Sequence, residues 1–128
     1  MNILLDSHSL LWAFASPARL SVAAQQAVLT LSNRVYVSAA SIWELSIKTA
    51  SGKLNAKIIL TEDLKRLLSE RGFMRLAIST DHALRAGQLP LVHKDPFDRM
   101  LAAQAQALNF PIISADPIFD RYGVRRIW

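Results

Sequence analysis

Four carboxylate side chains lie in apolar surroundings, where an isolated negative charge is unfavourable. They are Asp6, Glu44, Asp98 and Asp116. Asp6 and Asp116 each follow a short apolar run typical of a buried strand, and the other two lie in apolar helical segments. Carboxylates brought together repel each other unless a cation lies between them. Because the chain has no cysteine, such a set of oxygen ligands indicates Mg²⁺ or Mn²⁺ rather than zinc.

Helix capping offers a simpler explanation for two of these acids. Asp6 could accept a backbone hydrogen bond at the start of the helix that follows it. Glu44 stands three residues after Ser41, which is the spacing of a capping box, although Ser38 competes as the N-cap of the same helix. Either acid would then have a structural role instead of a catalytic one.

Asp95 and Asp98 share one helix start and need to be distinguished. Asp95 precedes Pro96, and because proline is favourable at the first helical position, Asp95 is predicted to be the N-cap rather than a metal ligand. Asp98 then lies in the first turn, where the helix dipole favours an acid in any case. Asp116, before Pro117, could likewise belong to an ordinary turn. No single acid is decisive, so the prediction of a metal site rests on all four together.

Strand-like runs and helical periodicities alternate along the chain. We expect strands over residues 2–6, 35–37, 73–78 and 111–114, with an edge strand over 124–127. We expect helices over residues 7–15, 21–32, 38–52, 61–72, 79–87 and 95–108. This alternation predicts one α/β domain spanning residues 1–128, a sandwich whose mainly parallel sheet is flanked by helices. In such sheets ligands bind beyond the carboxyl ends of the strands.

Composition restricts the expected partners and cellular setting. With 128 residues, 52% of them hydrophobic, the chain can bury one compact core. A formal net charge of +5 favours a polyanionic partner, most commonly nucleic acid. The absence of cysteine suits a reducing cytoplasm, and the first residues contain neither a basic leader nor a long apolar run. No segment is apolar over the length of a membrane span, so we expect a cytoplasmic protein without membrane contact.

Four segments carry a resemblance to a known family. They are LLDSHSLLW at 4–12, SAASIWEL at 38–45, HKDPFDRMLAAQA at 93–105 and ISADPIFDRYGV at 113–124. In this order they resemble the motifs of PIN-domain ribonuclease toxins, the VapC-like members of toxin–antitoxin pairs. Each segment is a weak signal alone, but the four together span almost the whole chain.

The resemblance implies a PIN-like three-layer sandwich and a metal-dependent endoribonuclease. It implies that Mg²⁺ or Mn²⁺ is held by Asp6, Glu44, Asp98 and Asp116. The metal would activate a water that cleaves an RNA phosphodiester bond, leaving a 5′-phosphate and a 3′-hydroxyl. Ser7 and Ser114 match the small hydroxyl residues beside the first and last acid. Asp98, rather than Asp95, carries the family's spacing to the segment AAQA at 102–105.

The family also implies protein partners. A toxin of this kind is held by a cognate antitoxin, and we expect its segment to lie across apolar residues near the active edge. Those residues are Leu10, Leu11, Trp12 and Phe14, although each could equally be part of the core. We further expect a homodimer with two-fold symmetry, the commonest arrangement of soluble oligomers.

The basic residues have competing explanations. Arg99 could hold a phosphate or form a structural ion pair with an acid of the site. Lys48, Lys53 and Lys57 could line the RNA path or could be a solvated helix face and loop. Three histidines, at 8, 82 and 93, have no partner at catalytic spacing and are expected to be structural.

Aromatic residues recur at helical spacing, which is typical of core packing rather than of base stacking. They are Trp12, Phe14, Trp43 and Phe97.

Three other kinds of protein remain alternatives. A housekeeping PIN nuclease that matures RNA would carry the same residues without an antitoxin. A phosphoacceptor receiver domain shares the size and the acid after the first strand, but it requires a lysine at the end of the last strand, where this chain has Arg125 and Arg126. A non-catalytic nucleotide-binding module requires a glycine-rich phosphate loop, and the four glycines are not clustered.

Overall fold

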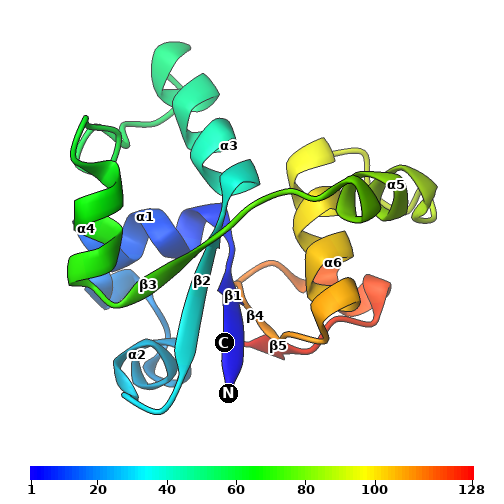
Figure 1. Ribbon diagram of the computed structural model, residues 1–128, viewed down its shortest axis with the longest axis horizontal. Helices are drawn as coiled ribbons and strands as arrows, with labels where there is room; N and C mark the ends of the chain where they lie inside the picture. Colours follow the sequence, from blue (N-terminus) through cyan, green and yellow to red (C-terminus); the bar gives the residue numbers. More distant parts are fainter.

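Five short strands, all parallel, form the central sheet in the computed structural model, which describes residues 1–128 (Figure 1). The strands are β1 (Asn2–Leu5), β2 (Arg34–Ser38), β3 (Phe73–Leu76), β4 (Ile112–Ile113) and β5 (Arg126–Ile127). Their order across the sheet is β3-β2-β1-β4-β5. The chain therefore builds the sheet outward from β1 to β3 and then returns to the other side of β1. The expected parallel α/β sheet is confirmed.

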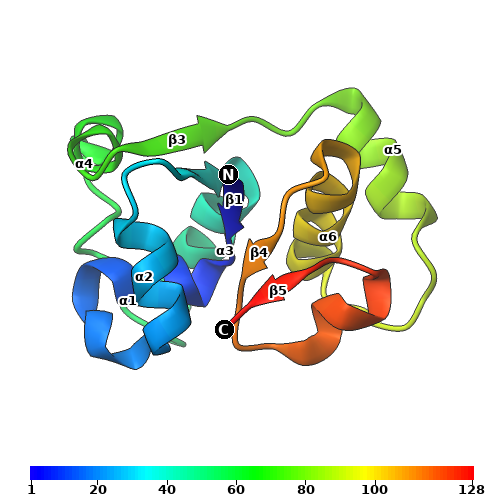
Figure 2. The same cartoon turned by 90° about the horizontal axis from the view of Figure 1, so that it is seen from below.

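Helices cover both faces of this sheet. They are α1 (Ser7–Ala15), α2 (Val22–Leu29), α3 (Ala39–Ala50), α4 (Leu64–Glu70), α5 (Thr80–Gln88) and α6 (Pro96–Leu108), with 3-10 helices η1 (Pro17–Arg19) and η2 (Pro117–Tyr122). Helices α1, α2 and α4 lie on one side of the sheet, and α5 and α6 lie on the other (Figures 1 and 2). The result is the three-layer sandwich expected from the sequence.

Alternating side chains on β1 join the two layers to the sheet. Ile3 and Leu5 belong to the core cluster shared with α1 and α2, whereas Leu4 belongs to the cluster shared with α6 and η2. All three are fully buried. Because successive residues of a strand point to opposite faces, a continuous apolar run is what a strand covered on both faces requires.

Side-chain caps begin most of the helices where the sequence predicts them. Ser21 accepts from the amide of Ala24 at the start of α2, and Ser38 accepts from the amide of Ala40 at the start of α3. Ser38 is therefore the N-cap of α3, and the capping box proposed for Ser41 and Glu44 is not formed. This result removes the simplest structural explanation for Glu44.

Several predicted elements are shorter in the structure. The helix expected over 21–32 ends at Leu29 because Thr30 adopts an extended conformation. The strand expected over 73–78 ends at Leu76, because its partner β2 ends at Ser38 and turns into α3. Strands β1, β4 and β5 and helix α4 are also shorter than expected by one to three residues at one or both ends, whereas β2 is one residue longer at each end. Element ends depend on pairing partners that a local pattern does not contain.

The reversal of strand order lies between β1 and β4, which are neighbours in the sheet. In parallel α/β sheets the crevice at such a switch point, beyond the carboxyl ends of the strands, is the usual ligand site. Asp6 follows β1 and Ser114 follows β4, so both residues lie at this crevice.

None of the helices combines the length and the apolar character that a membrane-spanning helix requires.

Candidate active site

Asp6 lies at the switch point and is 7% exposed. Its Oδ1 accepts from the backbone amide of Ser9 at 2.8 Å, so it does cap α1, as the simpler explanation proposed. Burial raises the pKa of this carboxyl above its ordinary value, against hydrogen bonds from Ser114 and Ser9 that lower it. Capping satisfies only part of the carboxylate, and the cost of burying its charge remains.

Glu44 reaches the same region from the second turn of α3 and is only 3% exposed. Its Oε1 accepts from the Ser7 hydroxyl at 2.5 Å, and its Oε2 pairs with Lys48 Nζ at 2.5 Å. The hydrogen bond to Glu44 is the main cause that raises the pKa of Lys48. Ser7 therefore connects Glu44 to the segment that carries Asp6, since the two residues are consecutive.

Asp98 is the acidic residue in the first turn of α6. Its Oδ2 lies 2.9 Å from His93 Nε2. Burial raises the pKa of Asp98 to about 6, and repulsion from Asp95 and Glu44 adds to this increase, whereas the hydrogen bond with His93 opposes it. Asp98 and Glu44 are thus close enough to repel each other, which brings α3 and α6 to one acidic region.

Asp95 caps α6, as predicted. Its Oδ1 accepts from the amides of Phe97 and Asp98 at 2.8 and 3.1 Å. It also belongs to a cluster with His93 and Asp98, in which one ligand atom from each residue lies within 4.8 Å of the others. Asp95 therefore has a structural role at the helix start and also adds negative charge beside Asp98.

Asp116 differs from the other three acids because it is exposed. Its Oδ1 accepts from the amide of Ile118 and caps η2, while its own amide donates to the Ser114 hydroxyl at 3.0 Å. Since Ser114 also hydrogen-bonds Asp6, the serine links the segment of Asp116 to the buried acid. Asp116 is therefore connected to Asp6 through Ser114, and its own carboxylate is in solvent.

Arg99 makes backbone contacts that the sequence did not predict. It is 8% exposed, and its guanidinium donates to the backbone carbonyls of Ala86, Leu89 and Pro90 at 2.9–3.0 Å. Arg99 does not form the ion pair with an acid of the site that was one of its two predicted roles, since Glu44 and Asp98 pair with Lys48 and His93 instead. Arg99 instead ties the end of α5 and the following loop to α6.

Two polar partners of the site were not recognised from the sequence. The sequence predicts a structural role for His93, but in the structure His93 pairs with Asp98. The position of His93, five residues before Asp98, is the sequence feature that could have indicated this pair. Lys48 was considered only for the RNA path, yet it pairs with Glu44 one helical turn away. In contrast His82 is structural as expected, because it completes a capping box with Ser79 at the start of α5.

The predicted apolar surface is also in a different place. Leu10 is fully buried, and Leu11, Trp12 and Phe14 are partly buried and pack against the core, which favours the core alternative for these residues. Trp43 was predicted to be core but is 60% exposed, and its ring contacts Phe97 edge-on.

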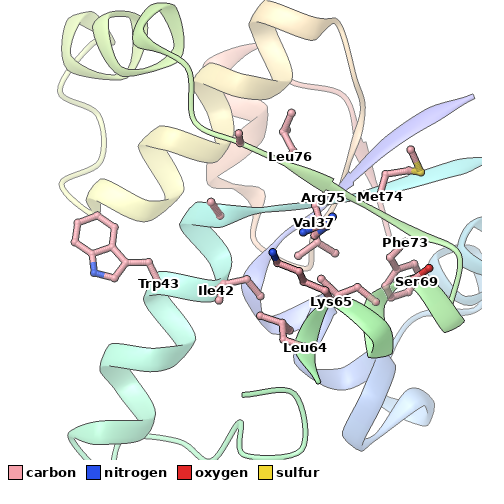
Figure 3. A pocket seen from close by; sticks show the side chains of 13 residues that line it. Val37, Ile42, Trp43, Leu64, Lys65, Ser69, Phe73, Met74, Arg75 and Leu76 are labelled. Carbon is pink, nitrogen blue, oxygen red and sulfur yellow. The ribbon is translucent and has the colours of Figure 1, made fainter. Parts of the chain in front are cut away.

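The largest hollow of the molecule lies away from the acids. This hollow, which we call the apolar groove, has a volume of about 790 Å³ and lies between α3, α4 and the edge strand β3. Figure 3 shows the side chains that line it. Its walls include Ile42 and Trp43 from α3, Leu64 from α4, and Phe73 and Met74 from β3. An exposed apolar surface of this kind is typical of protein contact rather than of catalysis.

The sequence profile of the PIN domain matches residues 3–125, so the chain belongs to the PIN domain family. This is a nuclease family, and the chain is therefore assigned to the nucleases. No curated protein matches the chain in sequence.

Solved structures with a similar fold come from several bacteria. One is the VapBC2 structure from Rickettsia felis bound to a DNA fragment from their promoter, with a TM-score of 0.71, 16% identity and full coverage of both chains. A toxin-antitoxin complex from Klebsiella pneumoniae gives a TM-score of 0.60 at 19% identity, covering 90% of this chain and 87% of that one. FitAcB from Neisseria gonorrhoeae gives 0.60 at 23% identity, covering 97% and 95%.

Proposed function

We propose that this protein is an endoribonuclease that depends on Mg²⁺ or Mn²⁺ and acts in the cytoplasm as the toxin of a toxin–antitoxin pair. Three observations carry the proposal: Asp6 and Glu44 are buried, the Ser7 hydroxyl links Glu44 to the segment of Asp6, and Glu44 lies close enough to Asp98 to repel it. Membership of the PIN domain family supports the nuclease chemistry.

The side chains of this region fit a divalent cation. All the donors are carboxylate oxygens, and no thiolate is present in the chain. Burial and mutual repulsion already disfavour the negative charge on Asp98, and a bound cation relieves both costs. We assign Asp6, Glu44 and Asp98 as ligands, with Asp116 as the fourth.

The neighbouring groups orient these ligands. The Ser7 hydroxyl holds one oxygen of Glu44, and Ser114 donates to Asp6. Asp95 fixes the first turn of α6 and thereby the direction of Asp98. When bound, a divalent ion supplies an activated water and neutralises charge on the attacked phosphate. Lys48 places a further positive charge beside Glu44 at the edge of the site.

The test of this activity is cleavage of single-stranded RNA by the purified protein. We expect cleavage with Mg²⁺ or Mn²⁺, 5′-phosphate products, and loss of cleavage with a chelator. Cleavage that continues at the same rate in excess chelator contradicts the metal dependence. Cleavage of DNA but not of RNA contradicts the assigned substrate.

An antitoxin is the partner that suits the apolar groove. The groove is apolar along its walls, and Lys65 and Arg75 at its lining have no carboxylate partner within the chain. An antitoxin segment with apolar and acidic residues would match both features. Toxin–antitoxin complexes are among the structures of similar fold, which supports this assignment.

Expression in cells distinguishes a toxin from a housekeeping nuclease. We expect the wild type expressed alone to slow growth, and the Asp6→Asn variant to be harmless. We also expect a two-fold homodimer, which mass measurement in solution reports. A harmless, monomeric wild type that still cleaves RNA supports the housekeeping alternative.

A further inference from the structure

A second hollow, of about 390 Å³, lies beside the acidic site and has the opposite charge. Its lining includes His8 and Trp12 from α1, Arg19 from η1, Lys48 from α3 and Lys53 from the loop after α3. We call it the basic cleft. No carboxylate lines it, so its charged side chains are all cationic or histidine. A concentration of positive charge of this kind favours a polyanion.

Two cations of the basic cleft, Arg19 and Lys53, are not neutralised by a carboxylate, whereas Lys48 pairs with Glu44. The Arg19 guanidinium lies 4.7 Å from the centroid of the Trp12 ring, a cation–π contact that holds it at the cleft. Trp12 is itself packed between His8 and Trp128, with ring centroids 5.8 and 5.9 Å away. Neither Arg19 nor Lys53 forms an ion pair with a carboxylate. The planar donor edge of Arg19 therefore stays available for an oxyanion.

The basic cleft is continuous with the acidic site through Lys48. This lysine lines the cleft and also pairs with Glu44, one turn earlier on α3. One turn of four residues advances about 6 Å along a helix axis, so the cleft begins within a few ångströms of the carboxylates. His8 lies two residues after Asp6 and lowers the pKa of that acid by its charge, which joins α1 to the same boundary.

We propose that the basic cleft binds the phosphates of a single-stranded RNA on one side of the bond to be cleaved, with Arg19 and Lys53 as the phosphate contacts. This inference rests on the proposed ribonuclease function. An acidic segment of a partner protein is another ligand for such charge, but the sharing of Lys48 with the acids favours the substrate strand.

Binding measured without metal tests the cleft independently of catalysis. The probe is a fluorescein-labelled oligouridylate in excess chelator, with anisotropy followed at several salt concentrations. We expect the Arg19→Gln, Lys53→Gln double variant to bind at least tenfold more weakly than wild type. Because about 0.7 counterions are released per phosphate contact of a single strand, the slope of log affinity against log salt should fall by about 1.4.

A matched control is Lys57→Gln. Lys57 lies in the same loop as Lys53 but does not line the cleft. We expect it to bind the oligonucleotide like wild type, and we expect all variants to keep the wild-type melting temperature. With metal present, the double variant should raise KM for RNA with little change in kcat. Wild-type binding and KM in a folded double variant overturn the inference, as does equal loss of affinity in Lys57→Gln.

The same experiments separate this inference from the proposed function. If the wild type cleaves RNA and the double variant cleaves it with the same KM, only the cleft assignment fails. If the wild type binds RNA through the cleft but cleaves no RNA with either metal, the ribonuclease proposal fails. A double variant that loses the partner protein but binds RNA normally assigns the cleft to protein contact and overturns the inference.

Discussion

Helix α3 separates two regions that have opposite chemistry. Glu44 points into the acidic site, where it has polar partners and is almost fully buried. Ile42 and Trp43, the two residues before it, line the apolar groove, where Trp43 is 60% exposed. In the acidic site, the free-energy cost comes from carboxylate charge that is removed from water. In the apolar groove, the cost comes from hydrophobic surface that remains exposed to water.

These two costs call for different ligands. A cation stabilises crowded carboxylates, and an apolar protein segment covers a hydrophobic groove. The difference indicates that one helix serves both chemistry and assembly, and that the two functions can be removed separately. The following predictions test that separation, beginning with the largest expected effect.

Removing one metal ligand should abolish cleavage without affecting assembly. Even residues that only support metal ligands cost about 10–100-fold when replaced, so Asp6→Asn should reduce the rate of RNA cleavage by at least about 100-fold. Asparagine retains the shape and can still accept from the Ser9 amide, so the fold should persist. The control is Glu62→Gln, an exposed acid outside the site, which should cleave normally. Undiminished cleavage by folded Asp6→Asn would contradict the site assignment.

The raised pKa of Asp98 should make the metal-free protein less stable as pH rises. The folded-state pKa of about 6 exceeds the ordinary 3.8, so the unfolded chain loses this proton first. Stability from this group is therefore lost between about pH 4 and pH 6 and stays low above that range. At about 1.4 kcal/mol per pKa unit, and after allowance for partial exposure, the loss is roughly 1–3 kcal/mol.

Comparison with Asp98→Asn isolates this group from the other acids that titrate. In chelator, the difference in unfolding free energy between the variant and the wild type should increase from pH 4 to pH 7, in favour of the variant. Added Mg²⁺ should raise the melting temperature of the wild type more at pH 7 than at pH 5. If the difference in unfolding free energy between Asp98→Asn and the wild type stays constant with pH, then ionisation of Asp98 does not destabilise the folded protein.

A charge placed in the apolar groove should affect assembly and leave chemistry unchanged. Met74 is 45% exposed on the edge strand, so Met74→Glu should fold normally. We expect its affinity for the antitoxin to fall at least about tenfold, since an acid both interrupts apolar contact and repels an acidic partner. The matched control is Leu31→Glu, whose parent side chain is fully exposed outside the groove. Impaired RNA cleavage by Met74→Glu would show that the two regions are not separable.

The smallest expected effect is the loss of stability when Asp95 is replaced, and it distinguishes the roles of Asp95 and Asp98 at the start of α6. Asp95→Ala removes the N-cap and should cost about 0.5–2 kcal/mol in urea unfolding. Asp98→Ala should instead remove cleavage. If Asp95→Ala abolishes cleavage at unchanged stability, then the cluster of His93, Asp95 and Asp98 is the metal site and the assignment must be revised.

Local patterns in the sequence predict the layers of this protein correctly. The continuous apolar run before Asp6 and the caps Ser21, Ser38 and Asp95 depend on residues within a few positions of one another. Their physical causes, strand burial and the satisfaction of the first helical amides, act over the same short range. The four acids could be chosen for the same reason, because each stands in an apolar local context.

Only the tertiary structure decides which groups meet and which surfaces remain open. The pairing of His93 with Asp98, the carbonyl contacts of Arg99 and the exposure of Trp43 all depend on how helices pack around the switch point between β1 and β4. A helical stripe of apolar residues is the same whether a neighbouring helix covers it or not. The sequence therefore determines which residues are able to hold a metal or form a core, whereas the packing of distant segments decides which of them do so, because contact energy depends on neighbours in space.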